Sequence, residues 1–259
     1  MSLLSLKRLL GLQVNASSSG AGVDNLLLGV HALMFVLFVG WLSFFILALI
    51  RFNRRAHPKA DYAGVKNHAS SWLEALVALI EAVLLIGLAL PLWARAVDQF
   101  PKGGKPGDVT TIKVIAAQFN WHGWYPAPNG EFAKQDMKFV SGDNPYGLDK
   151  TDSNYKSNFI VASELVVPVH KPVVVYITSM DVIHSFSIKP MRVTQDAIPG
   201  MSIPAWFTPE KTGTYQINCA QLCGVSHYGM RGTLKVVSQE DYDKWVAKNT
   251  SPVAGTSQL

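Results

Sequence analysis

Four side chains with sulfur or nitrogen donors lie close together near the C-terminal end of this 259-residue chain. They are Cys219, Cys223, His227 and Met230, spaced four, four and three residues apart, and the sequence contains no other cysteine. Thiolate, imidazole and thioether groups select copper over hard cations such as Mg²⁺ or Ca²⁺. The segment therefore predicts a soft-metal site.

Several kinds of site could use these residue types. A mononuclear blue-copper site takes one Cys, two His and a weak axial Met, so this segment has one Cys too many. A structural zinc site closes with four strong ligands and has no use for Met. Two thiolates in one tight loop could instead bridge a pair of metal ions, and a disulfide between Cys219 and Cys223 is a further alternative.

A bridged pair of copper ions needs a second imidazole besides His227, and His184 is the candidate. It follows the apolar, β-branched run 172–178, which predicts a buried strand, so it lies where a strand gives way to a loop. Packing or surface roles are expected for the remaining histidines, which are His31, His57, His68, His122 and His170.

The chain resembles subunit II of haem-copper cytochrome c oxidases from its first apolar helix to about residue 242. The segments that carry the resemblance are 181–186 (DVIHSF), 196–200 (DAIPG) and 219–230. The resemblance implies a subunit that accepts electrons from cytochrome c or a similar periplasmic donor. It would pass them to haem in subunit I, where O₂ is reduced with proton translocation. A copper A subunit of a nitric oxide reductase is the alternative.

The resemblance also implies a copper A centre of two Cu ions with six ligands. These are the bridging thiolates of Cys219 and Cys223, the imidazoles of His184 and His227, and two weak ligands, Met230 and the backbone carbonyl of Gln221. Most relatives carry Glu at position 221, and its carboxylate binds a Mg²⁺ shared with subunit I. A neutral amide is a weaker ligand for a hard cation, which makes a bound Mg²⁺ doubtful here.

The composition predicts a protein that is part membrane and part soluble. The chain is 49% hydrophobic and only 16% charged. Two apolar stretches, 26–50 and 72–93, are long enough to cross a hydrocarbon core of ~30 Å at ~1.5 Å per residue. The loop between them, 51–71, carries five Lys or Arg against one Asp. The positive-inside rule places this loop in the cytoplasm.

The sequence accordingly predicts four segments. They are an external N-terminal segment (1–25), a transmembrane hairpin (26–93), an external domain (94–248) and a disordered tail (249–259). We expect the hairpin to lie in a bacterial inner membrane, with the external domain on the periplasmic side and subunit I and other oxidase subunits as partners. No nucleic acid is expected as a partner.

The external domain is predicted to be an all-β Greek-key sandwich, because short β-like runs alternate with Gly, Pro and Asn. The resemblance sharpens this fold class to a cupredoxin-like sandwich. A long polar stretch, 126–157, is expected to be a surface insertion. The predicted strand runs are 109–119, 159–166, 172–178, 214–218 and 232–237.

Two carboxylates, Glu74 and Glu81, fall inside the second apolar stretch. They are seven residues apart, which places them two turns apart on nearly the same helix face. In the family a Glu near the cytoplasmic end of this helix marks the entry of a proton path into subunit I. Glu74, seventeen residues before Pro91, matches that offset. Many relatives have Pro where this chain has Glu81, which we predict to need a polar partner.

An aromatic cluster at 118–125 is the predicted place of electron entry. In the family a Trp follows the Gln of this segment directly, whereas Phe119 stands there in this chain. Either Trp121 or Tyr125 then takes the electron-entry role of that Trp, or the donor docks elsewhere. From residue 94 onward the chain has 16 Lys and Arg against 14 Asp and Glu. This near balance predicts a donor that is not strongly basic, or docking that is largely apolar.

Overall fold

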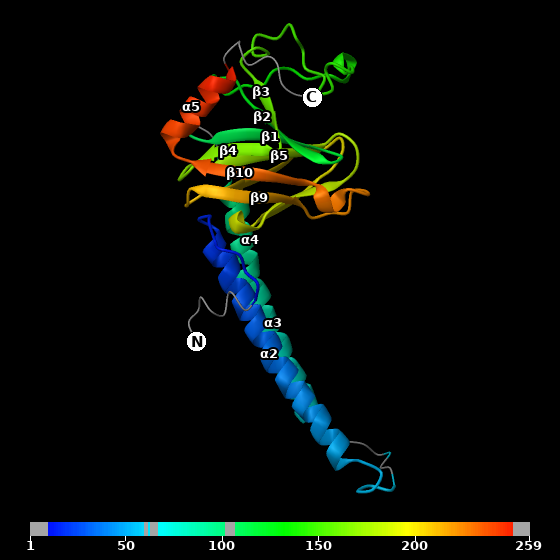
Figure 1. Cartoon of the computed structure of the whole chain (residues 1–259). Helices are drawn as coiled ribbons and strands as arrows, with labels where there is room; N and C mark the ends of the chain where they lie inside the picture. The colour runs from blue at the N-terminus through cyan, green and yellow to red at the C-terminus, as the bar shows by residue number, and fades with distance from the viewer. Residues whose placement is uncertain (1–9, 60–61, 63–66, 102–106, 251–259) are drawn as a thin grey trace. The chain divides into compact units, whose positions relative to one another are not determined.

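The computed structural model describes residues 10–59, 62, 67–101 and 107–250. The chain divides into two compact units (Figure 1). One contains two long helices within residues 21–99, and the other combines Gln13–Gly20 with the domain that begins at Phe100. Parts of the predicted segments 1–25, 51–71 and 249–259 lie outside the described residues.

The helical unit contains two helices that are long and apolar enough to cross a membrane. The first is α2 (Gly20–Arg51), and the second runs without a break through α3 (Ala69–Leu84), the π-helical turn η1 (Leu85–Ala89) and α4 (Leu90–Asp98). Their apolar side chains point outward and none is buried in the centre of either helix. Such surfaces suit lipid or neighbouring helices rather than water.

A proline explains the wide turn in the second helix. Pro91 has no N–H and cannot donate to the carbonyl of Gly87, four residues earlier, as an α-helical residue would. At this point the Leu90 N–H donates to the carbonyl of Leu85, five residues earlier. The π turn therefore lets the helix continue past Pro91.

The second unit is a sandwich of two five-stranded sheets. One sheet has the order β3-β2-β1-β5-β8 and the other β4-β10-β9-β6-β7. Strand β1 pairs parallel with β5, and β10 pairs parallel with β4, whereas the other pairs are antiparallel. This mixture confirms the predicted Greek-key, cupredoxin-like sandwich. The strands are β1 (Thr110–Ala117), β2 (Asn120–Tyr125), β3 (Phe159–Ala162), β4 (Glu164–Pro168), β5 (Val173–Ser179), β6 (His184–Ile188), β7 (Val193–Ala197), β8 (Ile203–Phe207), β9 (Gly213–Cys219) and β10 (Arg231–Val237).

The apolar run 159–166 forms two strands in different sheets, not one. Ser163 separates β3 from β4 and has a φ of 63°, in the left-handed region. Its N–H donates to the carbonyl of Trp121 (2.8 Å), and its carbonyl accepts from the N–H of Thr233 (2.7 Å). Ser163 thus turns the chain from one sheet to the other while its backbone groups stay paired.

The core lies between the two sheets and consists of aliphatic and aromatic side chains from both. Alternate residues of each strand point inward, as the two-residue period of a strand requires. Burying this apolar surface is the main favourable contribution to folding of the domain. The fully buried members include Ile112, Val114, Val175, Ile177, Phe186, Ile217 and Leu234.

The stretch between β2 and β3 packs as a small unit of its own. It holds the short 3₁₀ helix η2 (Met137–Phe139) and covers a second cluster around Trp124. The Nζ atom of Lys113 lies 4.3 Å from the Trp124 ring and 4.6 Å from the Phe132 ring. Burial between these rings lowers the pKa of Lys113.

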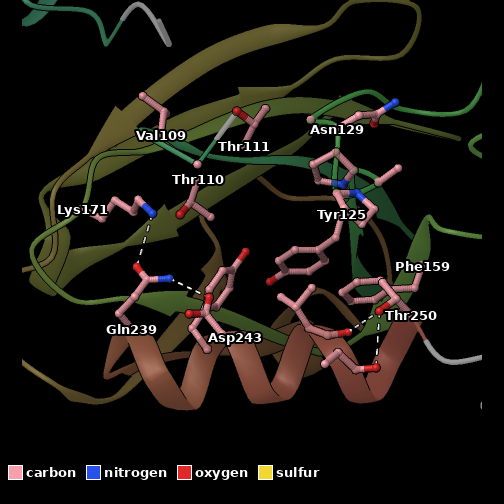
Figure 2. A pocket seen from close by; sticks show the side chains of 18 residues that line it. Val109, Thr110, Thr111, Tyr125, Asn129, Phe159, Lys171, Gln239, Asp243 and Thr250 are labelled. Carbon is pink, nitrogen blue, oxygen red and sulfur yellow. Dashed lines mark hydrogen bonds between the residues drawn. The ribbon is translucent and has the colours of Figure 1, made fainter. Parts of the chain in front are cut away.

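The C-terminal helix α5 (Gln239–Thr250) packs against the sandwich through Trp245, whose ring lies 4.9 Å from that of Tyr125. A cavity of about 650 Å³ lies on this side, and Lys171 and Gln239, which line it, are hydrogen-bonded to each other (Figure 2). Residues 249 and 250 end this helix instead of opening the predicted tail.

A short segment that precedes α2 in the sequence is also part of the sandwich unit. The Ala16 N–H donates to the carbonyl of Pro190 (2.9 Å), and the Ala16 carbonyl accepts from the N–H of Glu210 (2.8 Å). The Ser17 hydroxyl donates to the carbonyl of Met191 (2.9 Å). Ala16 and Ser17 are buried, so this N-terminal strap, residues 13–18, completes one edge of the domain.

Candidate metal centre

Strand pairing brings the predicted metal ligands together from two parts of the chain. His184 opens β6, and Cys219 closes β9. These strands pair with Phe186 opposite Cys219. His184 lies two residues before Phe186 and therefore faces the same side of the sheet as Cys219. The other candidate ligands lie on the loop that joins β9 to β10.

The donor atoms lie at distances that suit a shared metal site. Cys219 Sγ is 3.8 Å from Cys223 Sγ and 3.9 Å from His184 Nδ1. Cys223 Sγ is 3.5 Å from His227 Nδ1 and 3.8 Å from Met230 Sδ. Two ligands bound tetrahedrally to one ion at ~2.0–2.3 Å are about 3.3–3.8 Å apart. The observed separations of 3.5–3.9 Å are close to that range.

Both cysteines are free, so the loop holds two thiols rather than a disulfide. Burial, and then the hydrogen bond and charge of Cys219, raise the pKa of the Cys223 thiol to about 11. Cys223 is therefore protonated near neutral pH in the metal-free chain. A metal ion that binds it must displace this proton, so metal affinity is expected to increase as the pH rises.

The carboxylate of Asp181 orients His184. Asp181 Oδ1 lies 2.8 Å from His184 Nε2, and its Oδ2 accepts from the Gln118 N–H at 2.6 Å. Burial raises the pKa of Asp181, but hydrogen bonds from His184 and from backbone N–H groups outweigh it and hold this pKa below its usual value. With Nε2 engaged, the Nδ1 atom of His184 faces Cys219.

Gln118 links the β1–β2 turn to the ligand loop. Its Nε2 atom donates to the carbonyl of Cys223 at 2.6 Å. A Cβ atom on Gly224 (φ 139°) would lie 2.8 Å from Gln118 Nε2 and 3.0 Å from Phe119 Cζ. Only glycine at position 224 leaves room for the hydrogen bond from Gln118 to the Cys223 carbonyl. Through this bond the β1–β2 turn holds the ligand loop in one conformation.

The site is buried on one side and exposed on the other. The side chains of His184, Cys223 and Met230 are buried in the sandwich. The carbonyl of Gln221 faces the site, 3.1 Å from Cys219 Sγ. The neighbouring exposed residues form an apolar rim, which we define as Met180, Val182, Ile183, Leu222, Val225 and Tyr228.

The three residues considered for electron entry occupy different settings. Trp121 is fully buried, with its ring 6.1 Å from that of His184, and its Nε1 atom has no hydrogen-bond partner among the described residues. Tyr125 is fully buried too and stacks on Phe159. Burial shields both rings from direct contact with a docked protein, and electron entry through either of them stays a prediction. Phe119 is half-buried beside Gly224 and is the accessible ring of the three.

Glu74 belongs to the helical unit and is not among the residues that the metal centre brings together. Its side chain is exposed on α3, five residues after the helix begins at Ala69. Asp181 and Gln118 had no predicted role, although both contact the site. The Asp-x-x-His spacing at a strand end was a signal for Asp181, whereas the contact of Gln118 depends on tertiary folding.

Comparisons with known proteins agree with this architecture. The family model for the cytochrome c oxidase subunit II periplasmic domain matches residues 110–237. An alternative cytochrome c oxidase subunit 2 of Bradyrhizobium diazoefficiens is 29% identical over 211 residues, 81% of this chain and 73% of the relative. A probable cytochrome c oxidase subunit 2 of Rickettsia bellii is 32% identical over 222 residues, 85% of this chain and 75% of the relative.

Two further similarities have narrower coverage. The cytochrome c oxidase subunit 2 of Cereibacter sphaeroides is 32% identical over 206 residues, 74% of this chain and 65% of the relative. The crystal structure of the periplasmic domain of cytochrome oxidase subunit II from Bradyrhizobium japonicum is 32% identical. It covers 57% of this chain and 95% of that one, with a TM-score of 0.41.

The two helices and the sandwich with its His–Cys–Cys cluster define a membrane protein with a periplasmic, cupredoxin-like domain and a possible copper site. Within that class, the chain belongs to the cytochrome c oxidase subunit II family, whose members are subunits of an oxidoreductase complex.

We predict that Asp181→Asn weakens copper binding by about 10- to 100-fold, because the imidazole of His184 loses the carboxylate that orients it. The measurement is competition with a copper chelator on the full chain in detergent, with thermal unfolding of the metal-free chain as a check of folding. Asp143→Asn, an exposed carboxylate of the β2–β3 stretch, is the matched control. Equal affinities for the two variants would rule out a positioning role.

Proposed function

We propose that this chain is the electron-transfer subunit of a haem-copper oxidase and that its ligand loop holds two copper ions. The observation that carries the proposal is a chain of donor atoms from two free thiols, two imidazole Nδ1 atoms and a thioether, in which each of these atoms lies 3.5–3.9 Å from a cysteine sulfur of the site. Two thiolates exceed what one blue-copper ion takes, and sharing them between two ions uses every donor. His184 and His227 would each serve one ion.

Bound copper would accept and donate one electron at a time. The protein would hold the copper ligands in fixed positions during reduction and oxidation. The β6–β9 pairing sets His184 against Cys219, and Asp181 fixes the His184 ring. Gln118 holds the loop at the carbonyl of Cys223. Ligands held in this way move little when the charge of the site changes, and a small rearrangement favours fast electron transfer.

Burial supports the same role. His184, Cys223 and Met230 are shielded from water by the sandwich, so the site has a low local dielectric on its inner side. On the exposed side of the site, the backbone carbonyl of Gln221 is available as a weak copper ligand. The neutral side chain of Gln221 offers little to a hard cation, and we infer that no tightly bound Mg²⁺ accompanies the copper.

The copper proposal is tested by electron paramagnetic resonance on the full, copper-loaded chain in detergent. We expect a hyperfine pattern from one unpaired electron shared equally by two copper nuclei. Cys219→Ser should abolish this pattern, whereas Ser226→Ala, an exposed loop position, should retain it. A wild-type spectrum that shows a single copper nucleus would overturn the proposal.

We infer that the electron donor docks on the apolar rim beside Phe119. The rim includes exposed residues of the ligand loop itself, of which Leu222, Val225 and Tyr228 are at least 75% exposed. Residues from 94 onward carry nearly balanced charge, so the domain as a whole provides little attraction for a strongly basic partner. Electrons would then cross to subunit I, which we propose as the partner that carries haem.

This docking mode predicts a weak salt dependence of electron transfer from cytochrome c. The association rate, measured by stopped flow, should change far less with ionic strength than the about 10- to 1,000-fold range of electrostatic steering. Leu222→Asp should slow association, and Met137→Asp, equally apolar and exposed in the β2–β3 stretch, should not. A steep loss of rate with added salt would contradict apolar docking.

We also propose that Glu74 admits protons to a path in the catalytic subunit. Its exposed carboxylate lies near the start of α3, at the end of the helix next to the basic loop. Glu74→Gln keeps the shape but cannot carry a proton, so we expect slower oxygen consumption by the assembled oxidase with an unchanged copper spectrum. Ala75→Gln, which adds an amide at the next position, is the control. Unaltered turnover in Glu74→Gln would exclude the role.

A further inference from the structure

Glu81 is an ionisable residue deep inside the second apolar helix. It lies 12 residues after the start of α3 at Ala69 and 17 residues before the end of α4 at Asp98. Its side chain is exposed, and no hydrogen bond or ion pair reaches it from the part of the chain that the structure describes. A carboxyl group at this depth in a membrane is costly and needs a polar partner.

A groove between the two helices contains this carboxyl group. It has a volume of about 320 Å³ and is lined by aliphatic side chains of both helices, among them Val30 and Met34 of α2 and Leu84 of α3. Glu81 is the one ionisable residue in the lining. The groove is therefore apolar along its length, with a single hydrogen-bonding group in its wall.

The π turn shapes the same groove. Leu85 and Ala89, the first and last residues of η1, both line it next to Glu81. A π turn adds a residue to one turn of the helix and so changes which side chains face a neighbour. Pro91 explains the turn, and Glu81, Leu85 and Ala89, spaced four residues apart, all line the same groove.

We propose that this groove receives a transmembrane helix of another subunit, and that this helix presents a hydrogen-bond donor to the carboxyl group of Glu81. A lipid acyl chain would fill the apolar part but has no donor for the carboxyl group. A helix with a Lys, Arg, His, Tyr, Ser or Thr side chain at the depth of Glu81 satisfies both parts of the groove. The proposal rests on the proposed function in that the partner is another subunit of the oxidase.

The test uses the assembled oxidase, purified through a tag on this chain and challenged with increasing detergent. Glu81→Leu should reduce retention of the neighbouring membrane subunits by about three- to tenfold, as expected for a lost interhelical hydrogen bond in a bilayer. Glu81→Gln, which can still accept a hydrogen bond, should retain most of them. Ala89→Leu should also reduce retention because it fills the groove, and Ala78→Leu, outside the lining, should not.

Two results would overturn the proposal. One is full or improved retention in Glu81→Leu, since a lipid-facing carboxyl group is better replaced by leucine. The other is loss of a bound lipid or small molecule from Glu81→Leu with all subunits retained. The copper spectrum of each variant checks folding of the sandwich, and it reports on the proposed copper site independently of the retention of subunits.

Discussion

The pairing of β6 with β9 is the constraint on which the candidate metal centre depends. It places Phe186 opposite Cys219 and thereby sets His184, 35 residues away in sequence, beside the ligand loop. A shift of one residue in this register would turn Cys219 to the other face of the sheet. Phe186 and Ile217 lie on the face that Cys219 now occupies and are fully buried there, so the core resists such a shift, which would expose both side chains.

The parts of the site that depend on local spacing were predictable, and the parts that depend on packing were not. Cys219, Cys223 and His227 are close together in the sequence, and a strand pattern before His184 located the second imidazole. The contact of Gln118 with Cys223 joins residues 105 positions apart, which no periodicity reveals. The burial of Trp121 and Tyr125 could not be predicted either, since an aromatic residue on a strand can face either side of the sheet.

The fold was predictable to a similar extent. Long apolar stretches and alternating β-like runs were sufficient for the helical hairpin and the sandwich class. The apolar pattern did not predict the break at Ser163. The left-handed backbone of this residue divides one apolar run between two sheets. The strands β2, β6, β7 and β8 were not predicted, and in β7 and β8 the residues Thr194, Asp196 and Pro204 interrupt the apolar pattern. Cross-strand partners such as Val175, opposite Ala205, stabilise them instead.

The N-terminal strap means that the sandwich is not built from one continuous piece of sequence. Residues 13–18 reach it from before the first long helix, and Ala16 fills a place in its core. A water-soluble fragment cut after the second helix would lack this edge, leaving the carbonyls of Pro190 and Met191 without their partners. A better soluble form would supply the strap as a separate peptide, whose affinity would measure how much that edge contributes to the domain.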